Sequence, residues 1–275
     1  MSLLIDPLQY EFMQRGMIAA ILVGIVCAVV GTYVVLRGMA FFGDALAHTI
    51  LPGIALGYLI SGAGRESLFW WALGTAVVAA LGIGTLSKNS EIKEDTAIGI
   101  IFAGMFALGI ALISTVRSYA VDLSHFLFGD VLSVSFQSLW LILIFGGLVL
   151  LCIFAFYKEF MTLSFDPILA ATLRLPVGML NNLLLALIAV TVAVSLQTVG
   201  VALMVAMLVT PAATAYLLTR RLSRMMVLAA VLASFSGVIG LYLSYYLSIA
   251  SGAAIVLTAT FFFVIAFVWK LVKGT

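Results

Sequence analysis

Charged residues are so sparse in this chain that they divide it into long apolar segments. Of its 275 residues, 65% are hydrophobic and only 9% are charged, whereas roughly a quarter of the residues in a soluble domain are charged. About 20 consecutive apolar residues suffice for a helix to cross the hydrocarbon core of a bilayer. The sequence therefore predicts an all-α, polytopic membrane helical bundle, and a net charge of only +2 gives no reason to expect nucleic acid as a partner.

The charges and turn residues predict eight or nine transmembrane helices in one transmembrane domain, 1–275. The uncharged stretch 183–219 would be about 55 Å long as a single helix, so we place a break at Gln197 to Gly200. Pro211 is expected to interrupt the span that follows. One large cytoplasmic loop is expected at about 158–182, and a re-entrant or interfacial helix at 123–137. The nine candidate spans are 16–36, 39–60, 67–86, 96–115, 138–157, 183–198, 200–219, 225–247 and 254–270.

The distribution of Lys and Arg predicts the orientation, because cytoplasmic loops of membrane proteins are enriched in these residues. A cytoplasmic 87–95 loop leaves only Arg15, Arg65 and Arg117 on the outer side. The N-terminus is then outside and the C-terminus in the cytoplasm. The residues on the inner side would be Arg37, Lys88, Lys93, Lys158, Arg174, Arg220, Arg221, Arg224, Lys270 and Lys273.

Two ionisable residues lie inside the expected second span, where each is costly and therefore calls for a reason. Asp44 and His48 are four residues apart, which places both side chains on one face of a helix. A carboxylate oxygen and an imidazole nitrogen together suit Mn²⁺, Fe²⁺ or Zn²⁺. The same spacing also fits a hydrogen-bonded structural couple or a helix cap, and a proton relay is a further alternative. Two ligands leave the coordination sphere open, which suits an ion in transit.

Other polar residues have simpler interpretations. Glu94 and Asp95 precede the fourth span, where carboxylates complement the N-terminal end of a helix. His125 and Asp130 lie in the outer segment 123–137 and fit an ordinary surface position, although an outer gate or a docking surface is the alternative.

The cytoplasmic loop contains a short apolar helix signal. Asp166 is a candidate N-cap and Pro167 a first helical residue, with a helix expected through about Leu175 and with Pro176 and Gly178 as breakers. Such a helix must bury its apolar face, and from the residues alone the lipid interface and a soluble partner are equally good candidates.

Five blocks in this chain resemble the permeases of the bacterial manganese, zinc and iron family of ABC importers. Ala250 departs from the family pattern, which commonly has Pro before the Ser-Gly pair. The blocks are LRGMAFFGDALAHTILPGIALGY (36–58), EDTAIGIIFAGMFALGIAL (94–112), DLSHFLFGDVL (122–132), VGVALMVAMLVTPAATAYLL (199–218) and SGAAIVL (251–257).

The resemblance implies a type II-like ABC importer permease in the bacterial plasma membrane. Its implied partners are a second copy of the chain, cytoplasmic ABC ATPase subunits and an extracytoplasmic metal-binding protein. Asp44 and His48 match the family's metal-pathway residues. The 164–180 region matches the coupling helix that docks on the ATPase, which favours a partner over lipid and assigns coupling to Asp166, Pro167, Ala170, Ala171, Arg174 and Gly178.

The expected function is therefore ATP-driven import of a divalent metal, with Mn²⁺ favoured over Zn²⁺ and Fe²⁺. The chain has no Walker A pattern, so ATP hydrolysis is assigned to a partner and no cofactor is expected in this chain. Since metal binding needs a neutral imidazole, uptake should weaken as acid protonates His48. The alternatives are an ion-coupled secondary metal carrier and an ABC permease for a chelated metal or vitamin.

Overall fold

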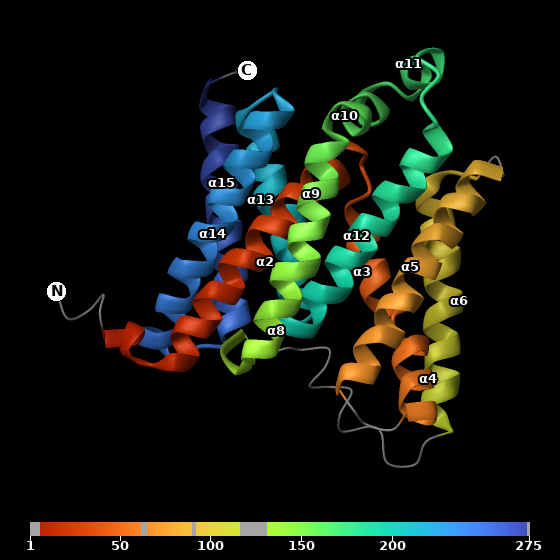
Figure 1. Ribbon diagram of the computed structural model, residues 1–275. Helices are drawn as coiled ribbons and strands as arrows, with labels where there is room; N and C mark the ends of the chain where they lie inside the picture. The colour runs from red at the N-terminus through yellow and green to blue at the C-terminus, as the bar shows by residue number, and fades with distance from the viewer. Residues whose placement is uncertain (1–5, 62–64, 90–91, 116–130, 274–275) are drawn as a thin grey trace. The chain divides into compact units, whose positions relative to one another are not determined.

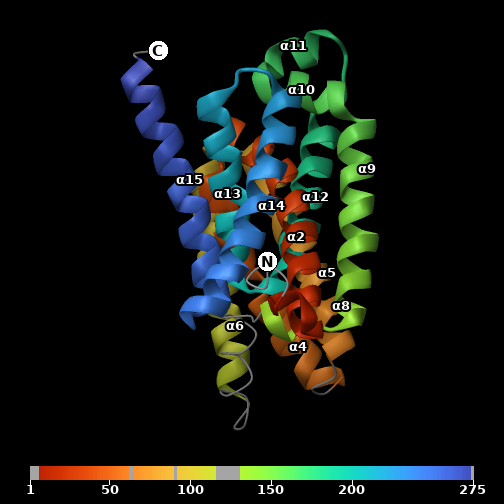
Figure 2. The ribbon, with the colours of Figure 1, turned by 90° about the vertical axis from the view of Figure 1, so that its left-hand side faces the viewer.

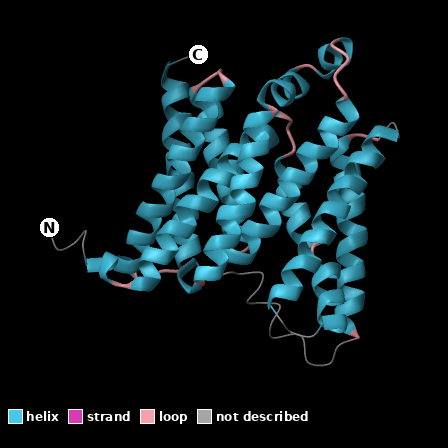
Figure 3. Cartoon of the chain, in the orientation of Figure 1, coloured by secondary structure: helices cyan, strands magenta, loops and turns pink. Residues whose placement is uncertain are grey.

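The computed structural model describes residues 6–61, 65–89, 92–115 and 131–273, and within these ranges all regular structure is helical (Figure 3). Nine helical stretches in this part are long and apolar enough to cross a membrane, which confirms the upper count from the sequence. The spans are α2 (Glu11–Leu36), α3 (Ala40–Thr49) with α4 (Leu51–Ser61), α5 (Arg65–Asn89), α6 (Glu94–Ser114), α8 (Phe136–Leu141) with η3 (Ile142–Gly146) and α9 (Gly147–Ala155), α12 (Val177–Val199), α13 (Val201–Leu218), α14 (Leu222–Leu247) and α15 (Ser251–Lys273) (Figure 1).

The remaining elements are short. The 3-10 helices η1 (Asp6–Gln9) and η2 (Val131–Ser133) lie before α2 and α8, and the helices α10 (Tyr157–Phe165) and α11 (Pro167–Thr172) connect α9 to α12. Of the predicted segment 123–137, residues up to 130 lie outside the described part, and its last two residues already belong to α8.

The chain forms two compact units, described here one at a time. The first takes in the described residues of 1–35, 125–150 and 195–275. In it α13, α14 and α15 pack against one another, as Figures 1 and 2 show, and α2 packs against α13 and α14 through glycines. A Cβ atom on Gly31 would collide with the carbonyl oxygen of Leu208, and one on Gly24 would lie 3.3 Å from Cβ of Ala233.

The second unit takes in the described residues of 36–124 and 151–194. Its core is the packing of α3, α4, α5 and α6. Helix α4 approaches α5 closely because Gly53 and Gly57 face it, and a Cβ atom on Gly53 would lie 2.5 Å from the carbonyl oxygen of Trp71. Gly109 of α6 lies against Leu51, where α3 gives way to α4. Small residues thus fix the helix that continues the second span.

Gly53→Ala is expected to destabilise the protein, because the added methyl group would collide with both the Thr75 side chain and the backbone carbonyl of Trp71 on α5. Overpacking of this kind costs about 1–3 kcal/mol. Thermal unfolding of the purified protein in detergent measures the effect. Gly74→Ala on α5 is the matched control, since a Cβ there meets nothing within 4 Å, and equal melting temperatures for the two variants would contradict the packing argument.

The second span is divided rather than continuous. The regular helical pattern stops after Thr49 and resumes at Leu51, although Ile50 keeps right-handed helical backbone angles. Pro52 has no N–H and cannot donate to the carbonyl four residues before it, that of His48. The division therefore falls directly after the two ionisable residues of this span.

The break predicted at Gln197 to Gly200 is confirmed: α12 ends at Val199 and α13 begins at Val201. Gly200 has a φ of +80°, a conformation that glycine adopts without the steric cost of a Cβ atom. The expected interruption at Pro211 is wrong, because α13 runs through it. The missing N–H of Pro211 removes a single backbone hydrogen bond, and the side-chain hydroxyl of Thr214 donates to the carbonyl of Thr210 in the same part of the helix.

Candidate metal site and candidate coupling helix

The two ionisable residues of the second span both lie on α3 and face the same side of it. Nε2 of His48 is 3.8 Å from the Oδ1 atom of Asp44. This separation exceeds hydrogen-bond distance, so the hydrogen-bonded structural couple that the spacing allowed is not formed. The side chain of His48 is 28% exposed and that of Asp44 is 36% exposed. Both can therefore contact a ligand that lies outside the unit.

The geometry of this pair suits a shared divalent cation. Metal–ligand distances of about 2.0–2.2 Å for imidazole nitrogen and carboxylate oxygen bring the two ligand atoms to roughly 3.0–3.5 Å of each other, slightly closer than they are now. In the described part of the chain no third His, Cys, Asp or Glu joins them to complete a metal site. Two ligands do not complete the coordination sphere of such a cation.

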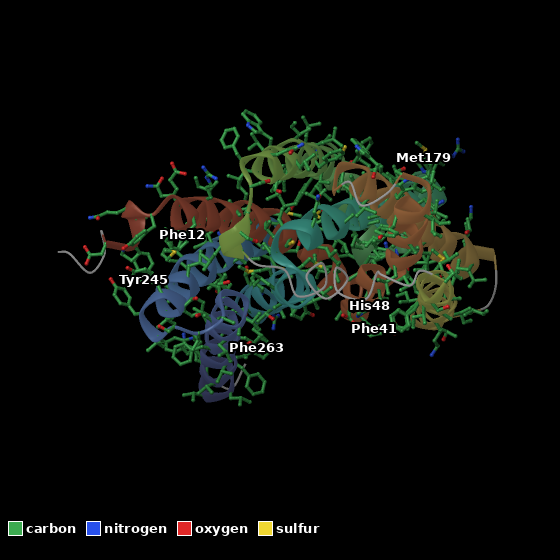
Figure 4. The ribbon with its side chains drawn as sticks, turned by 90° about the horizontal axis from the view of Figure 1, so that it is seen from below. Phe12, Phe41, His48, Met179, Tyr245 and Phe263 are labelled. Atoms are coloured by element: carbon green, nitrogen blue, oxygen red, sulfur yellow. The ribbon has the colours of Figure 1, made fainter. Side chains whose placement is uncertain are left out.

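Two phenylalanines pack against the imidazole of His48 and a third packs against one of them; we call Phe41, Phe102 and Phe106 the phenylalanine cluster. The rings of Phe102 and Phe106 on α6 meet the imidazole edge to face, with centroids 5.9 and 5.6 Å away. They stack on each other at 5.7 Å, and Phe41 packs edge-on against Phe102 at 5.9 Å. Figure 4 shows Phe41 and His48 on the same flank of α3.

The sequence did not indicate the phenylalanine cluster. Aromatic residues at positions 102 and 106 are four apart on an apolar helix, which is the ordinary pattern of a membrane span. Their proximity to His48 depends on the packing of α6 against α3. Nδ1 of His48 is buried, and no described residue forms a hydrogen bond with it.

The short helix predicted after Asp166 forms, and it begins where the sequence predicts. The Asp166 side chain accepts a hydrogen bond of 2.9 Å from the N–H of Leu169, and Pro167 is the first helical residue of α11. Such an N-cap satisfies one of the N–H groups that the first turn leaves unpaired.

The helix ends earlier than predicted, at Thr172 instead of about Leu175. Arg174 adopts a φ of +56°, and the N–H of Leu175 bonds back to the carbonyl of Ala170 at 3.1 Å. This is the C-terminal arrangement usually built on glycine. Gly178 is not a breaker, because it lies in the first turn of α12, where a Cβ atom would meet Nζ of Lys88 at 2.7 Å.

Helix α11 exposes apolar side chains on its outer face. Ala170 is completely buried, whereas Ala171 is exposed. We call the exposed set Phe165, Ile168, Leu169 and Leu173 the α11 apolar face, and Ile168 is the most exposed of them at 80%. These large side chains are 48% to 80% exposed, and either the lipid interface or a partner protein would remove them from water.

An ion pair at the first turn of α6 was not predicted from the sequence. The Nη2 atom of Arg37 donates to both carboxylate oxygens of Glu94 at 3.0 and 3.4 Å, and the two side chains are only 14% and 25% exposed. Burial lowers the pKa of the Arg37 guanidinium, and the charge of Glu94 opposes that shift. Glu94 does lie in the first turn of α6 as predicted, but it also binds the residue that follows α2.

Glu94→Gln is expected to destabilise the protein by about 1.5–3 kcal/mol, the usual contribution of a hydrogen bond to a charged group. The variant keeps the side-chain shape but leaves a largely buried guanidinium without its counter-charge. Melting temperatures in detergent measure the loss. Asp95→Asn removes a neighbouring exposed carboxylate from the same turn and is expected to leave the melting temperature unchanged; equal losses in both variants would contradict a role for the pair.

His125 and Asp130 lie outside the described residues, so their interpretation as surface residues, an outer gate or a docking surface stays a prediction.

Known proteins resemble this chain over almost its whole length. The sequence model of the "ABC 3 transport family" matches residues 9–270. The "Manganese transport system membrane protein MntC" of Halalkalibacterium halodurans is 48% identical over 267 residues, which cover 97% of this chain and 90% of that protein. The "Chelated iron transport system membrane protein YfeD" of Yersinia pestis is 39% identical, over 99% of this chain and 90% of that protein.

One solved structure matches the fold with considerable sequence identity. It is described as "PsaBC from Streptococcus pneumoniae in complex with Fab". The match has a TM-score of 0.82 and 41% identity, and it covers 96% of this chain and 94% of that one.

Proposed function

This chain belongs to the ABC 3 transport family, and from that premise we propose that it imports Mn²⁺, or Fe²⁺ as the second choice, as the membrane subunit of an ABC importer. It is a multi-pass membrane protein and a permease subunit, not an ATPase. ATP binding and hydrolysis therefore belong to a partner in the ABC transporter complex.

The observation that carries the choice of cargo is the Asp44 and His48 pair on α3. A carboxylate and an imidazole within 3.8 Å of each other form the kind of donor set that divalent first-row metals bind. Neither side chain is buried, so an ion can reach both. The pair supplies two ligands, and we assign the others to water and to the same pair of a second copy, in a homodimer with one pathway between its halves.

Helix α11 is the proposed contact with the ATPase. Its exposed side chains are apolar, the composition that protein interfaces bury at their centre. Asp166 and the turn at Arg174 fix its two ends, so that movement of a docked ATPase is transmitted to α10 and α12, which flank it. The motion then alters the side of the membrane to which Asp44 and His48 are open.

The proposed location is the bacterial plasma membrane, with the N-terminus outside and the C-terminus in the cytoplasm. Two features support this orientation: nine spans place the ends on opposite sides, and the Lys and Arg residues concentrate on the side of α11. An extracytoplasmic metal-binding protein delivers the ion on the opposite side.

Reconstitution of the chain with its ATPase and its delivery protein in liposomes tests the function. We expect Mn²⁺ to stimulate ATP hydrolysis and ATP-dependent uptake more than Fe²⁺ or Zn²⁺ at equal free concentration. Liposomes that contain this chain without the ATPase are the control. Metal uptake by the chain alone, driven by a proton or sodium gradient, would identify a secondary carrier and overturn the proposal.

A further inference from the structure

The environment of His48 is unusual for a residue that binds a metal. Metal-ligating histidines almost always donate their second ring N–H to a carboxylate, a carbonyl or water, which fixes the ring and makes the ligating nitrogen more basic. Nε2 of His48 faces Asp44 at 3.8 Å and is the ligating atom of the proposed site. Nδ1 is the second nitrogen, and it is buried with no hydrogen-bond partner among the described residues.

Two aromatic rings pack against the same imidazole. Phe102 and Phe106 lie one helical turn apart on α6, and each meets the imidazole edge to face. Because the two rings also stack on each other, and Phe41 supports Phe102 from α3, the imidazole is confined from one side by a packed surface. This surface restricts the rotation of the ring but provides no oxygen or nitrogen atom to accept a proton from Nδ1.

We propose that Phe102 and Phe106 are positioning residues that hold the His48 imidazole toward Asp44 while denying Nδ1 a hydrogen-bond acceptor, so that the site binds its metal weakly and releases it quickly. The inference rests on the proposed function, because it assigns His48 as a ligand of the transported ion. Loss of an outer hydrogen-bonding partner usually weakens metal binding 10- to 100-fold. In a transport site that weakness is useful, since an ion that binds too tightly does not leave.

Paired substitutions at each phenylalanine separate positioning from simple packing. Methionine and glutamine have nearly the same length and volume, but only the glutamine amide accepts a hydrogen bond from an N–H group. We compare Phe106→Gln with Phe106→Met, and Phe102→Gln with Phe102→Met, in the purified complex with its ATPase. Equilibrium dialysis against Mn²⁺ without the delivery protein gives the metal Kd, and proteoliposome uptake gives the maximal rate.

The glutamine variant at one position or both is expected to bind Mn²⁺ about 10-fold more tightly than its methionine counterpart and to transport it more slowly. Adding His48→Ala to the glutamine variant should abolish the tighter binding, because the amide acts through the imidazole. If the phenylalanines act only through packing, the Gln and Met variants should change the Mn²⁺ affinity in the same direction. Neither variant should then bind Mn²⁺ more tightly than the native chain.

Two results would overturn the inference. Equal Mn²⁺ affinity in the glutamine and methionine variants at both positions excludes a role for the missing acceptor. Tighter binding that persists after His48→Ala makes the amide itself a ligand and excludes positioning. Failure of the proposed function is recognised separately: His48→Ala in the otherwise native chain would then transport Mn²⁺ normally.

Discussion

His48→Ala and Asp44→Ala are each expected to reduce Mn²⁺ uptake by about 100-fold or more while the complex with the ATPase still assembles. Each variant removes one of the two ligand atoms that this chain offers to the ion. Since loss of an outer-sphere partner alone costs 10- to 100-fold in metal affinity, loss of a ligand should cost at least the upper end of that range. ATP-dependent uptake of Mn²⁺ into proteoliposomes measures the effect.

Asp44→Asn makes the test sharper, because it preserves shape and one oxygen but removes the negative charge that compensates a desolvated dication. We expect it to lose most of the uptake. The control is Asp95→Asn, which removes an exposed carboxylate at the start of α6. If Asp44→Ala and His48→Ala both transport at the native rate, the ion follows a different path.

The second large effect is expected at α11. Ile168→Glu should prevent recovery of the ATPase with the membrane subunit, because a charge replaces an apolar side chain at the centre of the α11 apolar face. Truncation of a central interface residue commonly costs 2 kcal/mol or more, which corresponds to about 30-fold in the dissociation constant. Co-purification in detergent and Mn²⁺-stimulated ATP hydrolysis both measure this loss.

Val272→Glu on α15 provides a control of equal exposure. Val272 is 81% exposed and Ile168 is 80% exposed, so that the two substitutions place the same charge on equally accessible positions of the chain. Only the variant in α11 should lose the ATPase. Normal recovery and normal ATP hydrolysis with Ile168→Glu would refute the assignment of α11 as the coupling helix.

The sequence predicted those features of the candidate site that depend on residues close together in the chain. A spacing of four residues places Asp44 and His48 on one face of any helix, whatever that helix packs against. The N-cap at Asp166 depends on a residue three positions away, which makes it equally local. Proline was a less reliable predictor of helix interruptions. Pro211 removes one hydrogen bond without ending α13, whereas Pro52 lies where the second span is divided.

Contacts between helices could not be predicted from the sequence, because they depend on how each helix is rotated about its axis. Apolar residues occupy every face of α6, so that nothing in the residue pattern distinguishes Phe102 and Phe106 from the rest of the helix. The ion pair between Arg37 and Glu94 joins residues 57 positions apart, and neither charge alone points to the other. Gly178 was mistaken for a helix breaker because a glycine can either end a helix or permit close packing within one.

Taken by itself, the order of residues predicted eight or nine membrane-spanning helices, since long uncharged segments of this length satisfy their backbone hydrogen bonds within a single helix, and the described residues contain nine candidate spans. It also determined that an oxygen and a nitrogen ligand share a helix face. The tertiary structure alone decided what surrounds them, because close packing at glycines and the fit of α6 on α3 are properties of surfaces that meet only after the helices have formed.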